Sequence, residues 1–203
     1  MRALLVNPWI YDFKAFDFWN KPVGLLMLAS LLKQNGFTVD LIDCLDRNHP
    51  AGRTETKTDI YGRGKYRFEI IDKPNIFRDV PRRYKRYGLP LEVFINLLKT
   101  TPEPDVILVT SSMTYWYPGV FDAIKYLKER FPSMPLILGG IYATICTEHA
   151  KKNSGADYVI AGPGETKVLE ILENLGLIKE STFDEDLLPD YSLYSELNYI
   201  VLL

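Results

Sequence analysis

Three short apolar runs that each stop at small residues constrain the fold of this chain most strongly. The runs lie at residues 106–109, 136–138 and 158–161, and serine, threonine or glycine follows each of them. A segment with helical character comes next in each case. This pattern is typical of parallel strands whose carboxyl ends share one edge of an α/β sheet. Ligands bind at that edge in open sheets, so the pattern predicts where a site lies before it predicts the ligand.

Helix-like and strand-like segments alternate over most of the remaining chain. Pro22 fits the first position of one helix, and Gly36 fits its left-handed stop. Five strands that alternate with helices predict a doubly wound five-stranded parallel sheet, flavodoxin-like or Rossmann-like, with strand order 2-1-3-4-5. The expected strands are residues 3–7, 39–43, 106–110, 136–138 and 158–161, and the expected helices are residues 23–35, 91–99, 118–131, 143–152 and 165–175.

A long basic insertion interrupts this alternation after the second strand. Residues 45–90 show no sustained helical or strand period, and the part from 47 to 90 holds twelve Lys and Arg against five Asp and Glu. That part therefore carries +7, and because the whole chain carries −2 the remainder carries −9. The tyrosines and phenylalanines of the insertion argue against disorder, because disordered segments are poor in aromatic residues. We predict an ordered cap or a docking arm.

Two parts of the insertion, residues 61–66 and 81–88, interleave cations with tyrosines. Such a mixture suits single-stranded nucleic acid, where bases stack on aromatic rings and cations neutralise phosphates. It suits equally well a contact with an acidic neighbouring domain, or the covering of a cofactor. The sequence leaves these three interpretations open.

Several common ligands of this fold lack their sequence signals here. A dinucleotide fold needs Gly-x-Gly-x-x-Gly directly after the first strand, but Asn7, Pro8 and Trp9 stand there, and proline offers no N–H. The phosphate loop of a flavodoxin, the acidic cluster of a phospho-receiver domain and the Walker A motif are absent as well. The predicted edge therefore offers space rather than charge. Glycine there admits a large flat ligand or a nucleotide-like tail close to the backbone.

Composition and cysteine content bound the class of protein. No apolar run approaches the roughly 18–20 residues needed to cross a bilayer, and residues 1–6 lack the features of a signal peptide. Two cysteines, Cys44 and Cys146, do not suffice for a disulfide framework or a four-thiolate metal site. We therefore expect a cytoplasmic protein without a membrane partner.

Motifs along the chain match those of one family in order and spacing. The matching segments are residues 4–8, 22–29, 36–39, 41–43, 110–115, 138–143 and 162–165. With them the chain resembles the amino-terminal cobalamin-binding domain of B12-dependent radical SAM proteins. The resemblance implies a cobalamin-binding domain at residues 1–178, with the insertion at 45–90, and a linker at 179–203. Because residues 199–203 look like a strand that is cut off, we expect a radical SAM barrel beyond Leu203 as the partner in the same chain.

The resemblance also implies which residues contact the cofactor, in three groups at the predicted edge. Those lining or flanking the slot for the displaced dimethylbenzimidazole tail are Ser111, Ser112, Thr114, Gly139, Gly140 and Tyr142. Those meeting the nucleotide loop or the corrin amides are Gly162, Gly164 and Glu165. Those under or beside the corrin ring are Asn7, Pro8, Trp9 and the stretch 113–116 that begins with Met113.

The chain departs from the better-known cobalamin domains in its histidines. Mutases and methionine synthase carry Asp-x-His-x-x-Gly after the first strand, and the histidine replaces the cofactor's own base on cobalt. Here no histidine precedes His49, which follows the second strand with the wrong spacing. We therefore expect base-off cobalamin without a histidine ligand, and we expect His49 and His149 at the surface.

The cysteine content limits what this chain can catalyse. Radical SAM chemistry needs Cys-x-x-x-Cys-x-x-Cys, in which three thiolates hold a [4Fe–4S] cluster that binds S-adenosylmethionine. The two cysteines here stand at positions 44 and 146, far from that spacing. We therefore expect no catalytic residue in this chain, and we expect the cluster and S-adenosylmethionine in the barrel of an enzyme such as a methyltransferase.

Two alternatives stay open from the sequence. One is a stand-alone α/β domain that binds flavin or a nucleotide. The other is a nucleic-acid-binding protein that uses the basic insertion. A gene that continues past Leu203 into a three-cysteine motif would favour the radical SAM interpretation over both.

Overall fold

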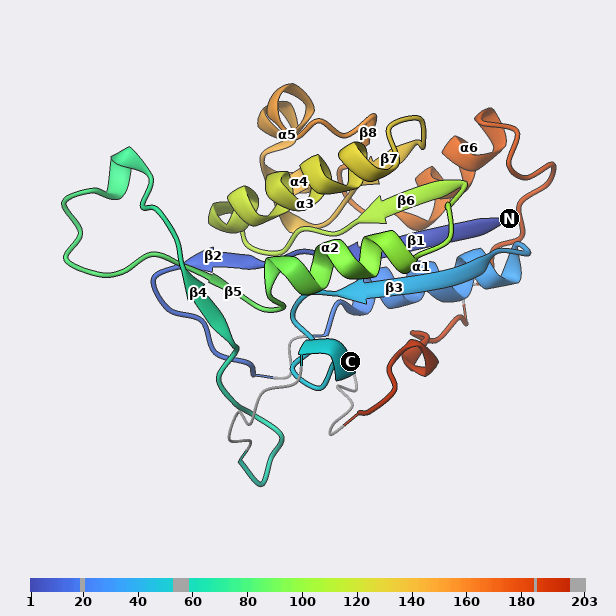
Figure 1. Cartoon of the computed structure of the whole chain (residues 1–203). Helices are drawn as coiled ribbons and strands as arrows, with labels where there is room; N and C mark the ends of the chain where they lie inside the picture. Colours follow the sequence, from blue (N-terminus) through green and yellow to red (C-terminus); the bar gives the residue numbers. More distant parts are fainter. Residues whose placement is uncertain (19–20, 53–58, 185, 198–203) are drawn as a thin grey trace.

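The computed structural model describes residues 1–18, 21–52, 59–184 and 186–197. Its centre is a five-stranded parallel sheet in the order β3-β1-β6-β7-β8 (Figure 1). The strands are β1 (Arg2–Asn7), β3 (Thr38–Asp43), β6 (Val106–Val109), β7 (Leu136–Leu138) and β8 (Tyr158–Val159). In chain order among themselves these strands run 2-1-3-4-5, so the predicted fold class is confirmed.

Helices cover both faces of the sheet and divide the core into two layers. One face packs against α1 (Val23–Gln34) and α6 (Glu165–Asn174). The other packs against α2 (Leu91–Thr100), α3 (Tyr117–Arg130), α4 (Ile141–Ile145) and α5 (Thr147–Asn153). Because side chains alternate along a strand, Leu4 of β1 enters the α2/α3 layer and Leu5 enters the α1/α6 layer.

The register of the sheet brings the strand ends together at one edge. β1 pairs in parallel with β3, so that Asn7 lies beside Asp43, and with β6, so that Val6 lies beside Val109. The direction of strand progression reverses between β1 and β6. In doubly wound sheets such a reversal opens a crevice at the carboxyl ends of the strands.

The helix predicted at residues 143–152 is instead two helices, α4 and α5. Cys146 separates them with φ −113° and ψ 42°, outside helical values. The Thr147 hydroxyl donates to the carbonyls of Ala143 and Thr144, at 2.9 Å each, which satisfies groups that the end of α4 leaves open. The sequence prediction missed this break because no glycine or proline marks it.

The insertion is folded where the structure describes it, and it contains short strands that the sequence analysis did not predict. Strands β4 (Phe68–Ile70) and β5 (Lys85–Tyr87) pair with each other and with β2 (Ile10–Asp12), in the order β2-β5-β4. Two 3₁₀ turns, η1 (Pro50–Gly52) and η2 (Asn75–Phe77), also lie in the insertion. Figure 1 shows the loop between β4 and β5 projecting away from the parallel sheet. Three-residue strands are too short for a period-2 pattern, which is why the sequence did not reveal them. The part at 53–58 lies outside the described residues.

The segment after residue 178, predicted to be a linker, packs on the domain as far as the structure describes it. The Ser30 hydroxyl of α1 donates to the Leu188 carbonyl at 2.6 Å, and Lys33 pairs with Asp190 at 2.5 Å. A short turn, η4 (Tyr191–Leu193), brings Tyr194 against the end of β3. The strand expected at residues 199–203 lies outside the described residues. Within the described parts of the chain, no helix combines the length and apolar character needed to span a membrane.

Candidate cofactor-binding site

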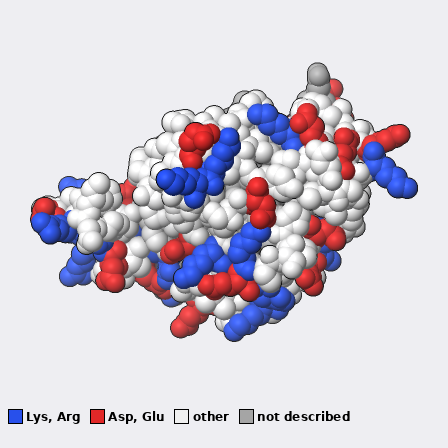
Figure 2. All heavy atoms as spheres, turned by 90° about the horizontal axis from the view of Figure 1, so that it is seen from above, with Lys and Arg blue, Asp and Glu red and all other residues white. Residues whose placement is uncertain are grey.

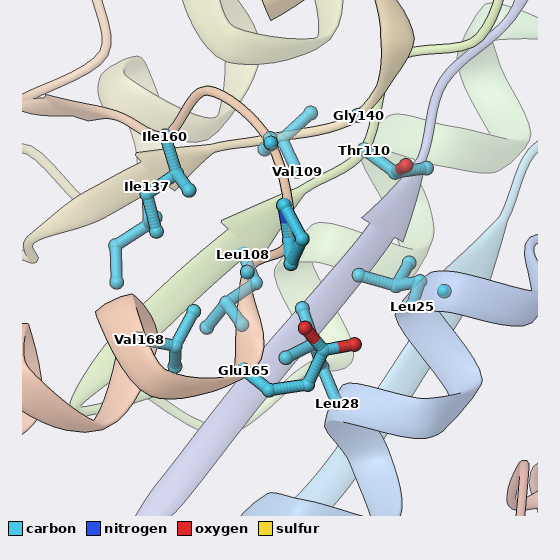
Figure 3. Close-up of a pocket in the computed structure, with 15 residues that line it drawn as sticks. Leu25, Leu28, Leu108, Val109, Thr110, Ile137, Gly140, Ile160, Glu165 and Val168 are labelled. Atoms are coloured by element: carbon cyan, nitrogen blue, oxygen red, sulfur yellow. The ribbon is translucent and has the colours of Figure 1, made fainter. Parts of the chain in front are cut away.

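A pocket of about 210 Å³ opens at the carboxyl ends of β6, β7 and β8, between α1 and α6 (Figure 3). Its walls come from the sheet, from the two helices and from the loops after β6, β7 and β8. The lining residues are Gly24, Leu25, Leu28, Leu108, Val109, Thr110, Ile137, Gly139, Gly140, Ile160, Gly162, Pro163, Gly164, Glu165 and Val168. The pocket therefore lies at the edge that the sequence predicted for a ligand.

Glycines shape this pocket in two different ways. Gly140 has φ 94°, and a Cβ there would lie 2.2 Å from the Ser111 carbonyl oxygen, so only glycine lets the loops after β6 and β7 approach this closely. Gly139 and Gly162 have free space around them instead, because no atom lies within 4 Å of a Cβ built on either. At these two positions the missing side chain leaves open space at the pocket.

Several backbone groups of this edge are already paired within the protein. The Gly139 N–H donates to Val109 O at 3.0 Å, and its carbonyl accepts from the Ser111 hydroxyl at 2.6 Å. Thr144 connects the next two loops, since its hydroxyl donates to Gly140 O at 2.9 Å and accepts from the Gly162 N–H at 3.0 Å. Among the lining side chains only Thr110 and Glu165 carry polar atoms. The pocket thus presents an apolar surface with two polar side chains.

Five of the thirteen predicted site residues line the pocket: Gly139, Gly140, Gly162, Gly164 and Glu165. They come from the loops after β7 and β8 and from the first turn of α6. Figure 3 shows Glu165 on α6 reaching toward Leu28 on α1, across the pocket from the sheet. The glycine-rich ends of two strands, which the sequence made visible, are therefore brought together as predicted. Whether they contact a cofactor stays a prediction.

Ser111 lies behind the pocket and holds its loops in place. Its side chain is buried, and its hydroxyl donates to Gly139 O at 2.6 Å and accepts from the Ala143 N–H at 3.3 Å. A hydroxyl engaged in this way is not free to bond a ligand. Ser112, Met113 and Thr114 continue from Ser111 toward the short turn η3 (Thr114–Trp116) and are not among the pocket-lining residues. Met113 is 46% exposed at this edge.

Trp9 and Tyr142 lie in the core, not at the surface where a corrin ring or its tail would lie. Trp9 is 1% exposed, donates from its indole nitrogen to Leu89 O at 2.6 Å, and packs on Phe94 at 4.6 Å between ring centroids. Tyr142 is equally buried, and its hydroxyl lies 2.7 Å from Nδ1 of His149. Both side chains face the α2/α3 layer, on the other side of the sheet from the pocket. Sequence alone did not say which face an aromatic residue next to a strand end would take.

Asn7 and Pro8 belong to the other half of the carboxyl edge, which we call closed because its buried polar groups pair with one another. Asn7 donates to Oδ1 of Asp43 at 2.7 Å, and the Tyr194 hydroxyl donates to Oδ2 of Asp43 at 2.6 Å. Pro8 is buried beside them. Burial raises the pKa of Asp43, while the nearby Lys21 ammonium and the Tyr194 hydrogen bond act against this rise.

Sequence reasoning missed the part of the site contributed by α1 and by Thr110. Gly24, Leu25 and Leu28 belong to a segment that the sequence showed to be helical, but its period does not say which of two helix faces borders a pocket. The signal that could have found them is Gly24 in the first turn, a weak helix former at a position where no atom lies within 4 Å of its Cβ. Thr110 directly follows β6, as the sequence showed.

The histidines and cysteines lie away from the pocket. His49 follows β3, where its Nδ1 accepts from the Ala51 N–H at 3.2 Å, and His149 is exposed on α5. Cys44 is fully buried, and burial raises the pKa of its thiol well above the usual value. In the described ranges no three His, Cys, Asp or Glu side chains gather as a metal site.

The size and chemistry of the pocket fit the flat base of a nucleotide-like tail. A cavity of about 150 Å³ lined by apolar side chains binds benzene, so about 210 Å³ with an open mouth gives room for a larger aromatic ring system. The aliphatic walls would cover both faces of such a base. The missing side chains at Gly139 and Gly162 would let its attached sugar and phosphate pass along the loops.

Comparison with known families agrees with this fit. The flavodoxin-like α/β architecture is typical of B12-binding domains, and residues 80–172 match the family model of the B12 binding domain. The match spans β6, β7, β8 and most of α6, with every loop that forms the sheet side of the pocket. It supports a cobalamin-binding domain in this chain and cobalamin as its cofactor. No curated protein matches the chain significantly.

Proposed function

We propose that this chain is the cobalamin-binding module of a radical SAM enzyme and holds the cofactor base-off, without a histidine ligand. The observation that carries the proposal is the apolar pocket between α1 and α6, which opens at the carboxyl edge within the segment that matches B12-binding domains. In this arrangement the pocket receives the displaced base of the nucleotide tail. The loops at the strand ends would then hold the rest of the cofactor.

The chain's own residues act by binding and orienting the cofactor. Cobalamin, when bound, supplies organocobalt chemistry. Aliphatic residues on α1, α6 and the sheet cover the base, and Gly139 and Gly162 leave room for the tail. Ser111 fixes the loop after β7 through Gly139 O, which holds this wall of the pocket in place. A preformed site lowers the ordering cost of binding.

The positions of the two histidines support a base-off state without a protein ligand to cobalt. His49 lies after β3 and lines a separate cavity beside Asp43 and Tyr194, not the pocket. His149, on α5, lies within hydrogen-bond distance of the Tyr142 hydroxyl and stacks on Phe121 with 6.0 Å between ring centroids. The lower face of a corrin placed over β6 and β7 would therefore meet backbone and aliphatic groups.

The radical SAM context rests on the family resemblance and on the cysteine content. The chain holds two cysteines, and neither lines the pocket. Iron–sulfur clusters need thiolate ligands, so the cluster and S-adenosylmethionine have to come from a further domain. We propose that this domain follows Leu203 and faces the same carboxyl edge.

The described part of the basic insertion gives little support to nucleic-acid binding. Arg86 pairs with Glu69, Arg47 with Asp17 at 2.7 Å, and Arg63 with Asp59 at 2.7 Å. Figure 2 shows basic and acidic side chains mixed over the visible face, without one large basic patch. Paired cations neutralise their partners rather than phosphates, so we do not propose this function.

An anaerobic titration with hydroxocobalamin, followed by visible spectroscopy, tests the proposal. We expect saturable one-to-one binding with a shift toward the base-off spectrum, and no spectral change when His49 or His149 is replaced by alanine. Flavin mononucleotide serves as the competing ligand and should not bind. Saturable flavin binding without cobalamin binding would contradict the assignment.

The same titration tests the absence of a histidine ligand. After reduction to Co(II), electron paramagnetic resonance reports a nitrogen ligand through its hyperfine splitting. We expect no nitrogen splitting in the bound state. A splitting that disappears in His49→Ala would show that this histidine does bind cobalt.

A further inference from the structure

We infer that the pocket selects among cobamides by their lower base and prefers 5,6-dimethylbenzimidazole to adenine. This inference rests on the proposed function, since it needs the base to leave cobalt and enter the pocket. It goes beyond that function because it assigns a specificity to the walls of the pocket.

The first argument is the chemistry of the side chains around the pocket. Eight of its fifteen lining residues are aliphatic or proline and five are glycine, which leaves Thr110 and Glu165 as the polar ones. Figure 3 shows the aliphatic side chains from α1, α6 and the strands facing one another across the pocket. Leu108, Ile137 and Val168 belong to the buried α1/α6 core layer, so the inner end of the pocket is apolar.

The second argument is that several backbone groups next to the pocket are already hydrogen-bonded within the protein. Both polar groups of Gly139 are bonded within the protein, and so are Gly140 O and the Gly162 N–H. At the mouth, the Gly164 carbonyl accepts from the Val168 N–H at 2.8 Å inside α6, and the Ala161 carbonyl accepts from Lys167. A ligand would have to break these bonds to gain its own.

The third argument compares the two bases. Dimethylbenzimidazole presents methyl groups and hydrocarbon edges, with a single ring nitrogen free once the base has left cobalt. Adenine carries further ring nitrogens and an exocyclic amine. A polar group that is buried without a partner loses its bonds to water without replacement, which weakens binding. Aliphatic walls therefore favour the benzimidazole.

Leu28 offers a way to change the wall without changing the fold. It lies on α1, half-buried, with its Cδ1 3.8 Å from a Cβ built on Gly164 across the pocket. Leu28→Gln would place an amide that can both donate and accept at this wall. Leu28→Met is the matched control, because methionine and glutamine are similar in length and both favour helices.

The experiment measures the affinity of wild type and both variants for two probes, hydroxocobalamin and its adenine-containing analogue. The cost of detaching each base from cobalt belongs to the free cobamide, so it cancels when affinity ratios are compared between proteins. It is also measured separately, from the base-on/base-off equilibrium of each free cobamide. After this correction we expect wild type to prefer hydroxocobalamin by about tenfold.

In Leu28→Gln the preference should fall by about fivefold, while Leu28→Met keeps it. Equal corrected affinities in wild type would overturn the inference, and so would a glutamine variant with an unchanged ratio. Both results would leave the cobalamin assignment intact. If neither cobamide binds, the proposed function is overturned, and the inference with it.

Discussion

The carboxyl edge of the sheet has two halves, both formed by the ends of parallel strands, but the residues at these ends differ. Over β6, β7 and β8 the strands end in glycine and threonine, and an apolar pocket opens there. Over β1 and β3 the strands end in Asn7 and Asp43, and the edge is closed by Tyr194 and Lys21. One half thus presents an open apolar pocket. In the other half the chain pairs its own polar groups, and a separate cavity of about 280 Å³ lies beside Asp43, His49 and Tyr194.

The difference teaches that the residues at the strand ends decide whether other parts of the chain pack over the edge of the sheet. Glycine leaves open space at Gly139 and Gly162. A buried carboxylate such as Asp43 needs hydrogen-bond donors, and the chain meets this need with Asn7, the Leu45 N–H and Tyr194. The segment that carries Tyr194 is thereby held on the domain.

Replacing Gly140 by alanine would break the open half most severely. The new Cβ would lie 2.2 Å from Ser111 O in a backbone conformation, φ 94°, that side chains rarely adopt. We expect a loss of about 3 kcal/mol or more in the free energy of unfolding, from strain and overpacking together. Urea denaturation measures it. A loss below about 1 kcal/mol would mean that the two loops do not need this close approach.

Replacing Gly139 by leucine would close the open half without disturbing its frame. No atom lies within 4 Å of this Cβ, and the residue lines the pocket. We expect hydroxocobalamin affinity to fall by at least about tenfold while thermal unfolding stays close to wild type. Gly139→Ala is the control and should lose less. Full affinity in the leucine variant would place the cofactor elsewhere.

Replacing Tyr194 by phenylalanine would loosen the closed half. Asp43 would keep Asn7 and the Leu45 N–H as donors but lose the hydroxyl at 2.6 Å. We expect a loss of about 1–2 kcal/mol in the free energy of unfolding, because the bond goes to a buried acid group. The control is Tyr115→Phe, a tyrosine that is 55% exposed, which should change little. Equal effects in both variants would argue against a special role for Tyr194.

Replacing Asp43 by asparagine would test how the protonation of this buried carboxyl group contributes to the stability of the closed half. Burial raises the pKa of Asp43 above 3.8, so between 3.8 and the higher folded value the folded state holds a proton that the unfolded state has lost. The free energy of unfolding of wild type should therefore fall as pH rises through this window. In Asp43→Asn we expect this contribution to vanish, seen in denaturation curves at several pH values. A wild-type stability that rises through the same window relative to the variant would contradict a raised pKa.

Much of the fold could be predicted because the signals were local. Apolar runs and the small residues after them gave the five parallel strands, and the alternation with helices gave their order. The short strands of the insertion were missed because their pairing with β2 depends on contacts between residues far apart in sequence, such as Ile10 with Tyr87. Three residues carry too little pattern to reveal such a partner.

The candidate site was predicted in part, and a physical reason separates the residues that could be predicted from those that could not. Glycines at strand ends were visible because glycine has few reasons to stand there other than space or a positive φ. Ser111 lies at the predicted edge, but its hydroxyl donates to Gly139 O and it does not line the pocket. Trp9 and Tyr142 were assigned to the surface although both are buried, because an aromatic residue after a strand suits a ligand and a core equally well.

By itself the sequence determined the parallel sheet, its strand order and the edge at which a ligand can bind, since these follow from local periodicity and from the backbone freedom of glycine. Only the tertiary structure decided which half of that edge is open. That choice depends on whether distant segments, α1 on one side and the chain around Tyr194 on the other, leave space or fill it. Such a result comes from the packing of side chains across the whole domain, which no single stretch of sequence encodes.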